Sequence, residues 1–116
     1  MFRFSAVTWN AHRVHYDLDY TTTVEGHTGL LVQAYLLASY LSQMLTAWGG
    51  PTGRITTISY RTRLPVHAGT PVHCWGRQIE VTDGDGFRDF DFEIGLTADD
   101  REAVTGTARV RQPTTA

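Results

Sequence analysis

The strongest constraint on the fold is an uncharged, largely apolar segment from Val32 to Trp48 that lies between two glycine-bearing turns. Residues 26–29 precede it and Gly49-Gly50-Pro51 ends it, which predicts a helix over 32–48. Its polar residues form one narrow, uncharged stripe: Ser39, Ser42, Gln43 and Thr46. Because an ordinary surface helix has charges on its outer face, we expect this helix to be enclosed nearly all round.

Strand-like segments flank the predicted helix. Alternation of apolar and polar residues predicts strands over 2–7, 54–64, 71–82, 87–96 and 104–111. The inward side chains of the last two strands are expected to be Phe90, Phe92, Ile94 and Leu96, and Val104, Gly106, Ala108 and Val110. The expected order is therefore a strand, an irregular segment over 8–20, the helix, and four strands in a meander. A single helix inside a curled antiparallel sheet is the simplest α+β packing that buries both apolar faces.

Length and composition limit the partners and the compartment. The 116 residues allow one domain, residues 1–116, with a frayed tail expected at 112–116. A domain of this size buries only part of its surface, so we expect contact with a partner chain to contribute to its stability. The net charge of −2 favours neither nucleic acid nor a membrane surface as partner. A single cysteine, and an N-terminus without the pattern of a signal peptide, predict a cytoplasmic protein.

The densest group of chemically reactive side chains lies in the irregular segment, where residues 8–17 read Thr-Trp-Asn-Ala-His-Arg-Val-His-Tyr-Asp. Loops of this kind often carry function. From composition alone, a histidine pair such as His12 and His15 is more often structural than catalytic. Asp17 either holds His15 in one tautomer or caps a turn. No zinc-ligand spacing is evident, so no metal site is predicted.

This segment resembles the MaoC-like hot-dog hydratases and dehydratases. His15-Tyr16-Asp17 matches the family's His-x-Asp, and Asn10 stands five residues before the histidine, where the family has Asp. The following residues, Val-Glu-Gly-His-Thr-Gly-Leu-Leu-Val over 24–32, are most similar to one branch of the family. That branch contains the 3-hydroxyacyl-thioester dehydratases and the mesaconyl- or methylfumaryl-CoA hydratases. The resemblance covers residues 2–41 and implies a hot-dog fold, with a long central helix wrapped by the sheet.

The resemblance also implies a reaction, the syn addition of water to an enoyl thioester or its reversal. His15 is then the acid/base group, because its unperturbed pKa suits proton transfer near neutral pH. Asn10 is expected to orient the water, since a carboxamide cannot act as a base. The backbone N–H of Ala34 is expected to stabilise the thioester oxygen as it gains charge. The pair Gln33-Ala34 stands where the family has His-Gly.

Other residues are expected to contact the substrate, which is an acyl thioester of coenzyme A or of a carrier protein. His12 would share the proton transfer, and Arg61 and Arg63 either meet phosphates of coenzyme A or form a solvated edge. The full set of expected substrate contacts is His12, Asp17, Gln33, Tyr35, Arg61 and Arg63. No metal or redox cofactor is expected, and the chain is expected to form a homodimer or a heterodimer with another hot-dog chain.

Three other functions remain open from the sequence. Asn10 and Gln33 would suit a non-catalytic hot-dog subunit that completes the acyl tunnel of an active partner. A hot-dog thioesterase usually places a carboxylate on or just before the central helix, and only Glu25 is near this one. A small-molecule-binding or cyclase-like role is the third alternative.

Overall fold

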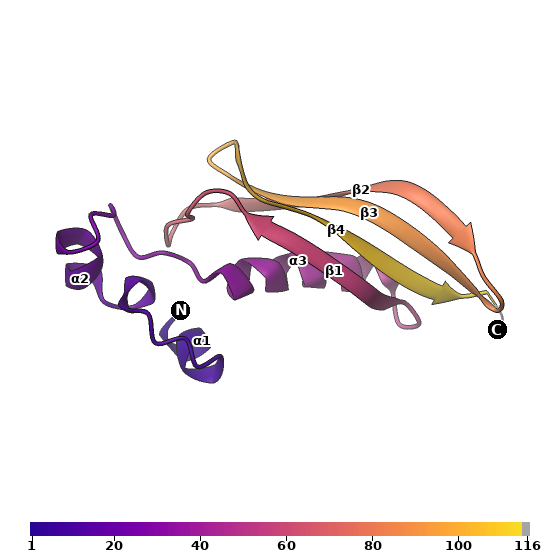
Figure 1. Cartoon of the computed structure of the whole chain (residues 1–116), viewed down its shortest axis with the longest axis horizontal. Helices are drawn as coiled ribbons and strands as arrows, with labels where there is room; N and C mark the ends of the chain where they lie inside the picture. The colour runs from indigo at the N-terminus through magenta and orange to yellow at the C-terminus, as the bar shows by residue number, and fades with distance from the viewer. Residues whose placement is uncertain (115–116) are drawn as a thin grey trace.

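A curved, four-stranded antiparallel sheet and one long helix make up most of the fold (Figure 1). The computed structural model of the chain describes residues 1–114. The strands are β1 (Arg54–Thr62), β2 (Val72–Asp83), β3 (Phe87–Ala98) and β4 (Arg101–Pro113). The helices are α1 (Phe2–Val7), α2 (Leu18–Thr23) and α3 (Ala34–Gly49), and a 3-10 turn, η1 (Arg13–His15), lies between the first two.

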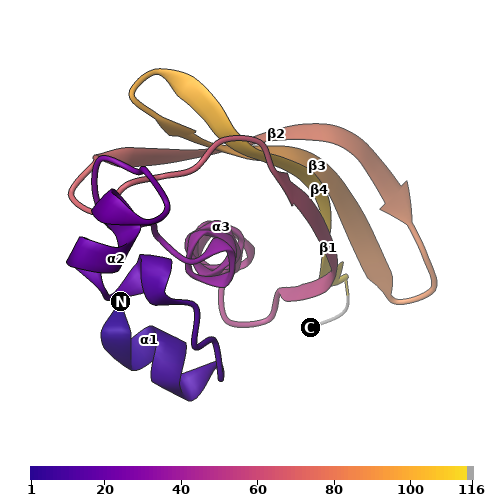
Figure 2. The same cartoon turned by 60° about the vertical axis from the view of Figure 1, so that its left-hand side comes forward.

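Helix α3 lies in the concave side of the sheet, and its existence and limits agree with the sequence prediction within two residues (Figure 2). It ends at Gly49, and its C-cap is Gly50, whose φ of 71° favours glycine and whose N–H donates to the carbonyl of Thr46. Its buried residues are Leu37, Leu41, Leu45 and Gly49. These pack against the inner face of β3 and β4, which is lined by Phe92, Ile94, Leu96, Val104, Ala108 and Val110.

The expectation that α3 is enclosed nearly all round is wrong for this chain. The sheet covers only one side of the helix (Figure 2), and Tyr35 and Trp48 are 63% and 46% exposed. One side of α3, which includes part of the uncharged polar stripe, is therefore left uncovered by this single chain.

The sheet order is β1-β4-β3-β2, so the predicted meander of four strands is wrong at its first step. Strands β2, β3 and β4 do form consecutive hairpins, but β1 pairs with β4 instead of β2. The connection from β1 to β2 carries the chain to the far edge of the sheet. Val66 in this connection is buried, and the backbone of His67 forms a bridge with Leu31.

The turn between β3 and β4 is formed by residues that tolerate a left-handed backbone. Asp99 and Asp100 join β3 to β4 with φ values of 51° and 58°, the backbone of a two-residue turn with both central residues left-handed. Strand β4 continues through Pro113, which pairs with Phe87. The expected frayed tail over 112–116 is therefore wrong for 112 and 113, and residues 115 and 116 lie outside the described part of the chain.

Residues 2–7 form a helix, so the predicted N-terminal strand is wrong. Over six residues, alternation of apolar and polar side chains does not separate a strand from a helical turn. Tertiary contacts decide the matter: Ser5 is buried, and the side chain of Gln33 binds it and the carbonyl of Met1. Helices α1 and α2 lie beyond the N-terminal end of α3 (Figure 1).

Candidate active site

A pocket of about 360 Å³ lies where the segment between α1 and η1, the start of α3 and the end of β1 meet. It brings together four of the side chains and backbone groups predicted from the sequence, in addition to His15. Its lining is Asn10, His15, Leu31, Val32, Ala34, Tyr35, Leu37, Thr62, Arg63, Leu64, Pro65 and Val66.

The imidazole of His15 is held in one tautomer. Its Nδ1 lies 2.8 Å from the carbonyl oxygen of Leu31. A carbonyl oxygen can only accept a hydrogen bond, so the proton of the neutral ring is on Nδ1. The lone pair is then on Nε2, which makes this nitrogen the one that can take a proton.

Backbone hydrogen bonds fix the segment that carries His15. The N–H of Leu31 donates to the carbonyl of Val14 over 2.9 Å, and the N–H of Val32 donates to the carbonyl of Val66 over 2.8 Å. Val14 itself is buried. The histidine and its acceptor are thus held together on neighbouring segments that are anchored to the loop before β2.

Asn10 lines the same pocket and is held there by its backbone and its side chain. Its N–H donates to the carbonyl of Ser5 over 2.9 Å, and its Oδ1 accepts the N–H of His12 over 3.3 Å. The oxygen of the carboxamide is engaged in this way, which leaves the amide nitrogen as the donor that it can offer to a water or a substrate oxygen.

Ala34 is the first residue of α3 and lines the pocket. The first N–H groups of an α-helix have no partner within the helix and point along its axis at the positive end of the helix dipole. The preceding residue, Gln33, makes no side-chain cap to them. The N-terminus of α3 therefore offers hydrogen-bond donors to an oxygen in the pocket that is gaining negative charge.

Gln33 lies outside the pocket lining, and its side chain is completely buried. Its Nε2 donates to the carbonyl of Met1 over 2.7 Å and to the hydroxyl of Ser5 over 2.8 Å. Within residues 1–114 its Oε1 has no hydrogen-bond partner. No local pattern in the sequence predicts this contact, because it joins residues 28 and 32 positions apart.

His12 and Asp17 also lie outside the pocket lining. The Nδ1 of His12 accepts the N–H of Val14 at the start of η1. Asp17 caps α2 by accepting the N–H of Tyr20 and forms an ion pair with Arg13 at 2.8 Å. The Tyr20 N–H and the Arg13 guanidinium hold the pKa of the Asp17 carboxyl below its usual value. Of the two readings that the sequence left open for Asp17, the structure shows the capping one.

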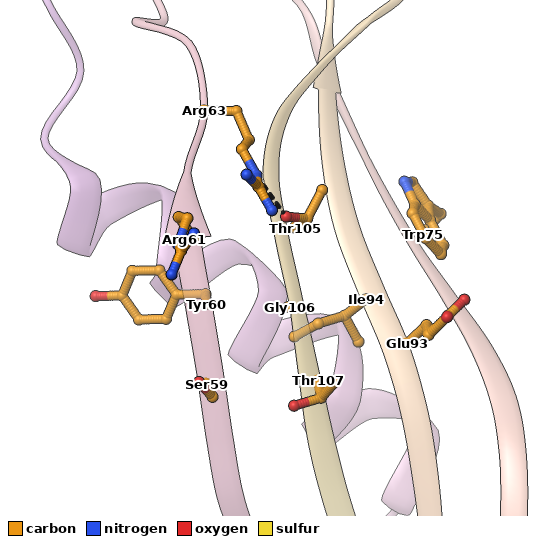
Figure 3. Close-up of a pocket in the computed structure, with 10 residues that line it drawn as sticks. All are labelled: Ser59, Tyr60, Arg61, Arg63, Trp75, Glu93, Ile94, Thr105, Gly106 and Thr107. Carbon is orange, nitrogen blue, oxygen red and sulfur yellow. Dashed lines mark hydrogen bonds between the residues drawn. The ribbon is translucent and has the colours of Figure 1, made fainter.

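Arg61 and Arg63 lie on the face of the sheet opposite to α3, where they line a second groove (Figure 3). Arg63 lines the pocket of His15 as well, whereas Arg61 does not. Tyr35 lines the His15 pocket from the first turn of α3.

A curled antiparallel sheet over one long helix defines the hot-dog class of protein. Solved structures confirm the fold. An (R)-hydratase from A. caviae involved in PHA biosynthesis is 23% identical, with a TM-score of 0.85 over 97% of this chain and 84% of that one. A chain of the ChsH1-ChsH2 complex from Mycobacterium tuberculosis is also 23% identical, with a TM-score of 0.77 over 96% of this chain and 84% of that one.

Residues 1–68 match the family described as hydroxyacyl-thioester dehydratase type 2, and the chain belongs to this family. The mesaconyl-C(4)-CoA hydratase of Chloroflexus aurantiacus is 41% identical over 66 residues. The match covers 57% of this chain and 23% of that protein, so the chain corresponds to less than a quarter of the length of this relative. The family resemblance predicted from residues 2–41 is confirmed.

Residues 1–114 contain neither a metal-binding cluster nor a helix that could span a membrane. No group of three or more His, Cys, Asp or Glu side chains in this part of the chain is arranged to hold a metal ion. None of its helices has the length and apolar character needed to cross a membrane.

Proposed function

We propose that this chain catalyses the reversible addition of water to an enoyl thioester, as an enoyl-thioester hydratase or 3-hydroxyacyl-thioester dehydratase. The observation that carries the proposal is the convergence of His15, Asn10 and the N-terminus of α3 on one pocket. Membership of the hydroxyacyl-thioester dehydratase family supports the same reaction.

Each of these groups has a separate role in the proposed reaction. Nε2 of His15 takes a proton from water while the water oxygen bonds to the β-carbon and the carbon–carbon double bond opens. Asn10 donates a hydrogen bond that orients the water. The thioester oxygen, which gains charge as the enolate forms, accepts the N–H of Ala34. The proton then passes from His15 to the α-carbon, which gives syn addition and restores the neutral imidazole.

This chemistry is proton transfer and charge stabilisation, so we propose that it needs no metal or redox cofactor. Coenzyme A or phosphopantetheine enters as part of the substrate. Since Cys74 is the only cysteine, the chain has no pair for an internal disulfide, and we propose a cytoplasmic location.

A thioesterase is less well supported, because no carboxylate lines the pocket within the described residues. Glu25, the acidic residue nearest to α3 in the sequence, accepts a hydrogen bond from the hydroxyl of Tyr20 over 2.9 Å and lies outside the pocket lining. A carboxylate nucleophile or base would have to come from elsewhere.

We propose that the chain acts as a dimer with a second hot-dog chain. The uncovered side of α3 and the exposed aromatic residues near the pocket support this proposal. One of the similar solved structures is the ChsH1-ChsH2 complex. A partner could be identical or different. If it is different, this chain is either the catalytic member or the one that completes the tunnel.

The test is hydration of crotonyl-CoA by the purified chain, followed by the loss of enoyl-thioester absorbance and by detection of 3-hydroxybutyryl-CoA. A panel of longer and branched enoyl-CoA substrates extends it. Turnover that disappears in His15→Ala supports the proposal. The alternative is a non-catalytic subunit. It would be established if the chain alone did not hydrate crotonyl-CoA and a co-expressed hot-dog chain restored hydration both with His15 and with His15→Ala.

A further inference from the structure

A groove of about 500 Å³ crosses the face of the sheet that points away from α3 (Figure 3). Arg61 and Arg63 form its wall on the side of β1, and Trp75 of β2 forms the opposite wall. The hydroxyl groups of Thr105 and Thr107, on β4, lie between them, and Ser59 lines the groove from β1. One row of paired residues spans the groove, because Arg61 pairs with Thr105, Thr105 with Gly95, and Gly95 with Trp75.

The groove carries two arginines that no carboxylate of residues 1–114 neutralises. Neither Arg61 nor Arg63 has a carboxylate within ion-pair distance among residues 1–114. Arg63 is oriented by its Nε, which donates to the hydroxyl of Thr105 over 3.0 Å and leaves its terminal nitrogens as donors. Glu93 is the one acidic residue in the described lining, and it is paired with Arg77.

Two arginines of β4 on the same face are neutralised. Arg109 contacts Asp91 at 2.7 Å, and Arg111 contacts Asp89 at 2.8 Å. The two arginines of the groove differ from these neighbours on β4, because neither has a carboxylate partner among residues 1–114. Two guanidinium groups beside hydroxyl donors form the kind of site that binds a phosphate group, often through two hydrogen bonds from one arginine.

The opposite wall is a fixed aromatic surface. A Cβ at Gly95 would lie 2.5 Å from the indole of Trp75, so the ring rests directly on the backbone of β3 and requires glycine beneath it. The indole nitrogen also donates to Glu102 over 3.2 Å. An aromatic side chain held in this way offers a surface on which a nucleic-acid base can stack.

Arg63 connects this groove to the pocket of His15, because it lines both. We propose that the groove binds the phosphate-bearing nucleotide end of coenzyme A while the thioester lies in the pocket. Arg61 and Arg63 contact the phosphates, and Trp75 contacts the adenine. The inference rests on the proposed hydratase function and adds to it the choice of coenzyme A over a carrier protein.

The first test is independent of turnover. Adenosine 3′,5′-bisphosphate, the nucleotide fragment of coenzyme A, is titrated into the purified chain by calorimetry. We expect saturable binding that weakens at least about tenfold in Arg61→Gln, in line with the loss of a charge-assisted hydrogen bond. Arg54→Gln is the matched control, because Arg54 is an exposed arginine of the same strand that does not line the groove.

The second test compares crotonyl-CoA with crotonyl-pantetheine, which lacks the nucleotide. We expect Arg61→Gln to lower the preference for the coenzyme A thioester, measured as the ratio of kcat/KM values, at least about tenfold, mainly through KM. Trp75→Leu should lower the same ratio, and Trp75→Phe should restore part of it. Arg54→Gln should leave the ratio unchanged.

The outcomes separate the two proposals. Binding of the bisphosphate that depends on Arg61, with no hydration of either thioester, would support the groove and refute the hydratase. Hydration with an unchanged substrate ratio in Arg61→Gln would refute the groove and leave the hydratase standing. A loss in Arg61→Gln confined to a carrier-protein thioester would also overturn the assignment to coenzyme A.

Discussion

The carboxamide nitrogen of Gln33 lies 2.8 Å from the hydroxyl oxygen of Ser5, deep in the contact between α3 and α1. The same nitrogen binds the carbonyl of Met1, and the carbonyl of Ser5 accepts the N–H of Asn10. A single buried amide thus joins the start of the central helix to the segment that carries one wall of the pocket. Asn10 and Ala34 are held relative to each other through it.

Gln33→Leu should therefore destabilise the protein and disturb the pocket. Leucine fills a similar volume but leaves the carbonyl of Met1 and the hydroxyl of Ser5 without this donor, which costs about 1–3 kcal/mol. The free energy of unfolding from denaturant titration measures the effect. Gln43→Leu, an exposed position on the same helix, is the control and should change it by less than about 0.5 kcal/mol. Equal effects of the two substitutions would mean that the buried amide contributes nothing specific.

His15→Ala should lower turnover of an enoyl-CoA by about 10²-fold or more, as expected for the loss of a general base. Circular dichroism should show that the fold is kept, since His15 is only partly buried. His73→Ala, on the exposed part of β2, should keep wild-type activity. Activity of His15→Ala equal to that of wild type would remove this imidazole from the mechanism.

Asn10→Asp should leave hydration unchanged or lower it. The carboxylate can still accept the N–H of His12, so the local backbone is preserved. However, a carboxylate in the same pocket competes with His15 for the proton that is transferred. The measurement is kcat/KM for crotonyl-CoA. A rise of at least tenfold from a wild type near background would show that the natural site is silent and would favour the partner-subunit function.

Asp89→Asn should make stability less dependent on acid pH. Hydrogen bonds from the Arg111 guanidinium hold the pKa of the Asp89 carboxyl below its usual value, with Arg109 adding a favourable charge. A lowered folded-state pKa stabilises the protein above the unfolded-state value near 4. This contribution is lost as the pH falls below it.

Unfolding midpoints between pH 2 and pH 7 test this expectation. Wild type should lose stability steeply below about pH 4, and Asp89→Asn should lose less over the same interval while being less stable at pH 7. Asp99→Asn is the matched control, because Asp99 lies in the exposed β3–β4 turn at a positive φ that asparagine tolerates. If the unfolding midpoint of Asp89→Asn depended on pH as steeply as that of wild type, the acid sensitivity would belong to other groups.

The chain should be at least dimeric at micromolar concentration. Large apolar side chains are exposed, including Trp9 at 95% and Tyr35 at 63%, and burial of such side chains against a second chain would stabilise a dimer. A closed two-fold pair is the expected symmetry. Static light scattering that showed only a 13.0 kDa species would contradict the prediction.

Much of the fold was predictable from local patterns. The limits of α3 follow from glycine-bearing turns and an uninterrupted apolar segment, and the inward faces of β3 and β4 follow from alternation. These signals depend on neighbours in the sequence, so no tertiary contact is needed to read them. His15 was predictable for a different reason: its family motif lies within one short segment and was visible without the fold.

Tertiary structure decided the features that depend on distant residues. Residues 2–7 form a helix because Gln33 binds its first turn, and β1 pairs with β4 because the chain after it crosses to the other edge of the sheet. Neither the contact of Gln33 with residues 1–5 nor the pairing of β1 with β4 produces a periodic pattern in the sequence. The sequence by itself determined the central helix, the hairpins and the catalytic histidine proposed here. Only the folded chain fixed the tautomer of His15 and the groove at Arg61, because each depends on groups that meet from separate elements.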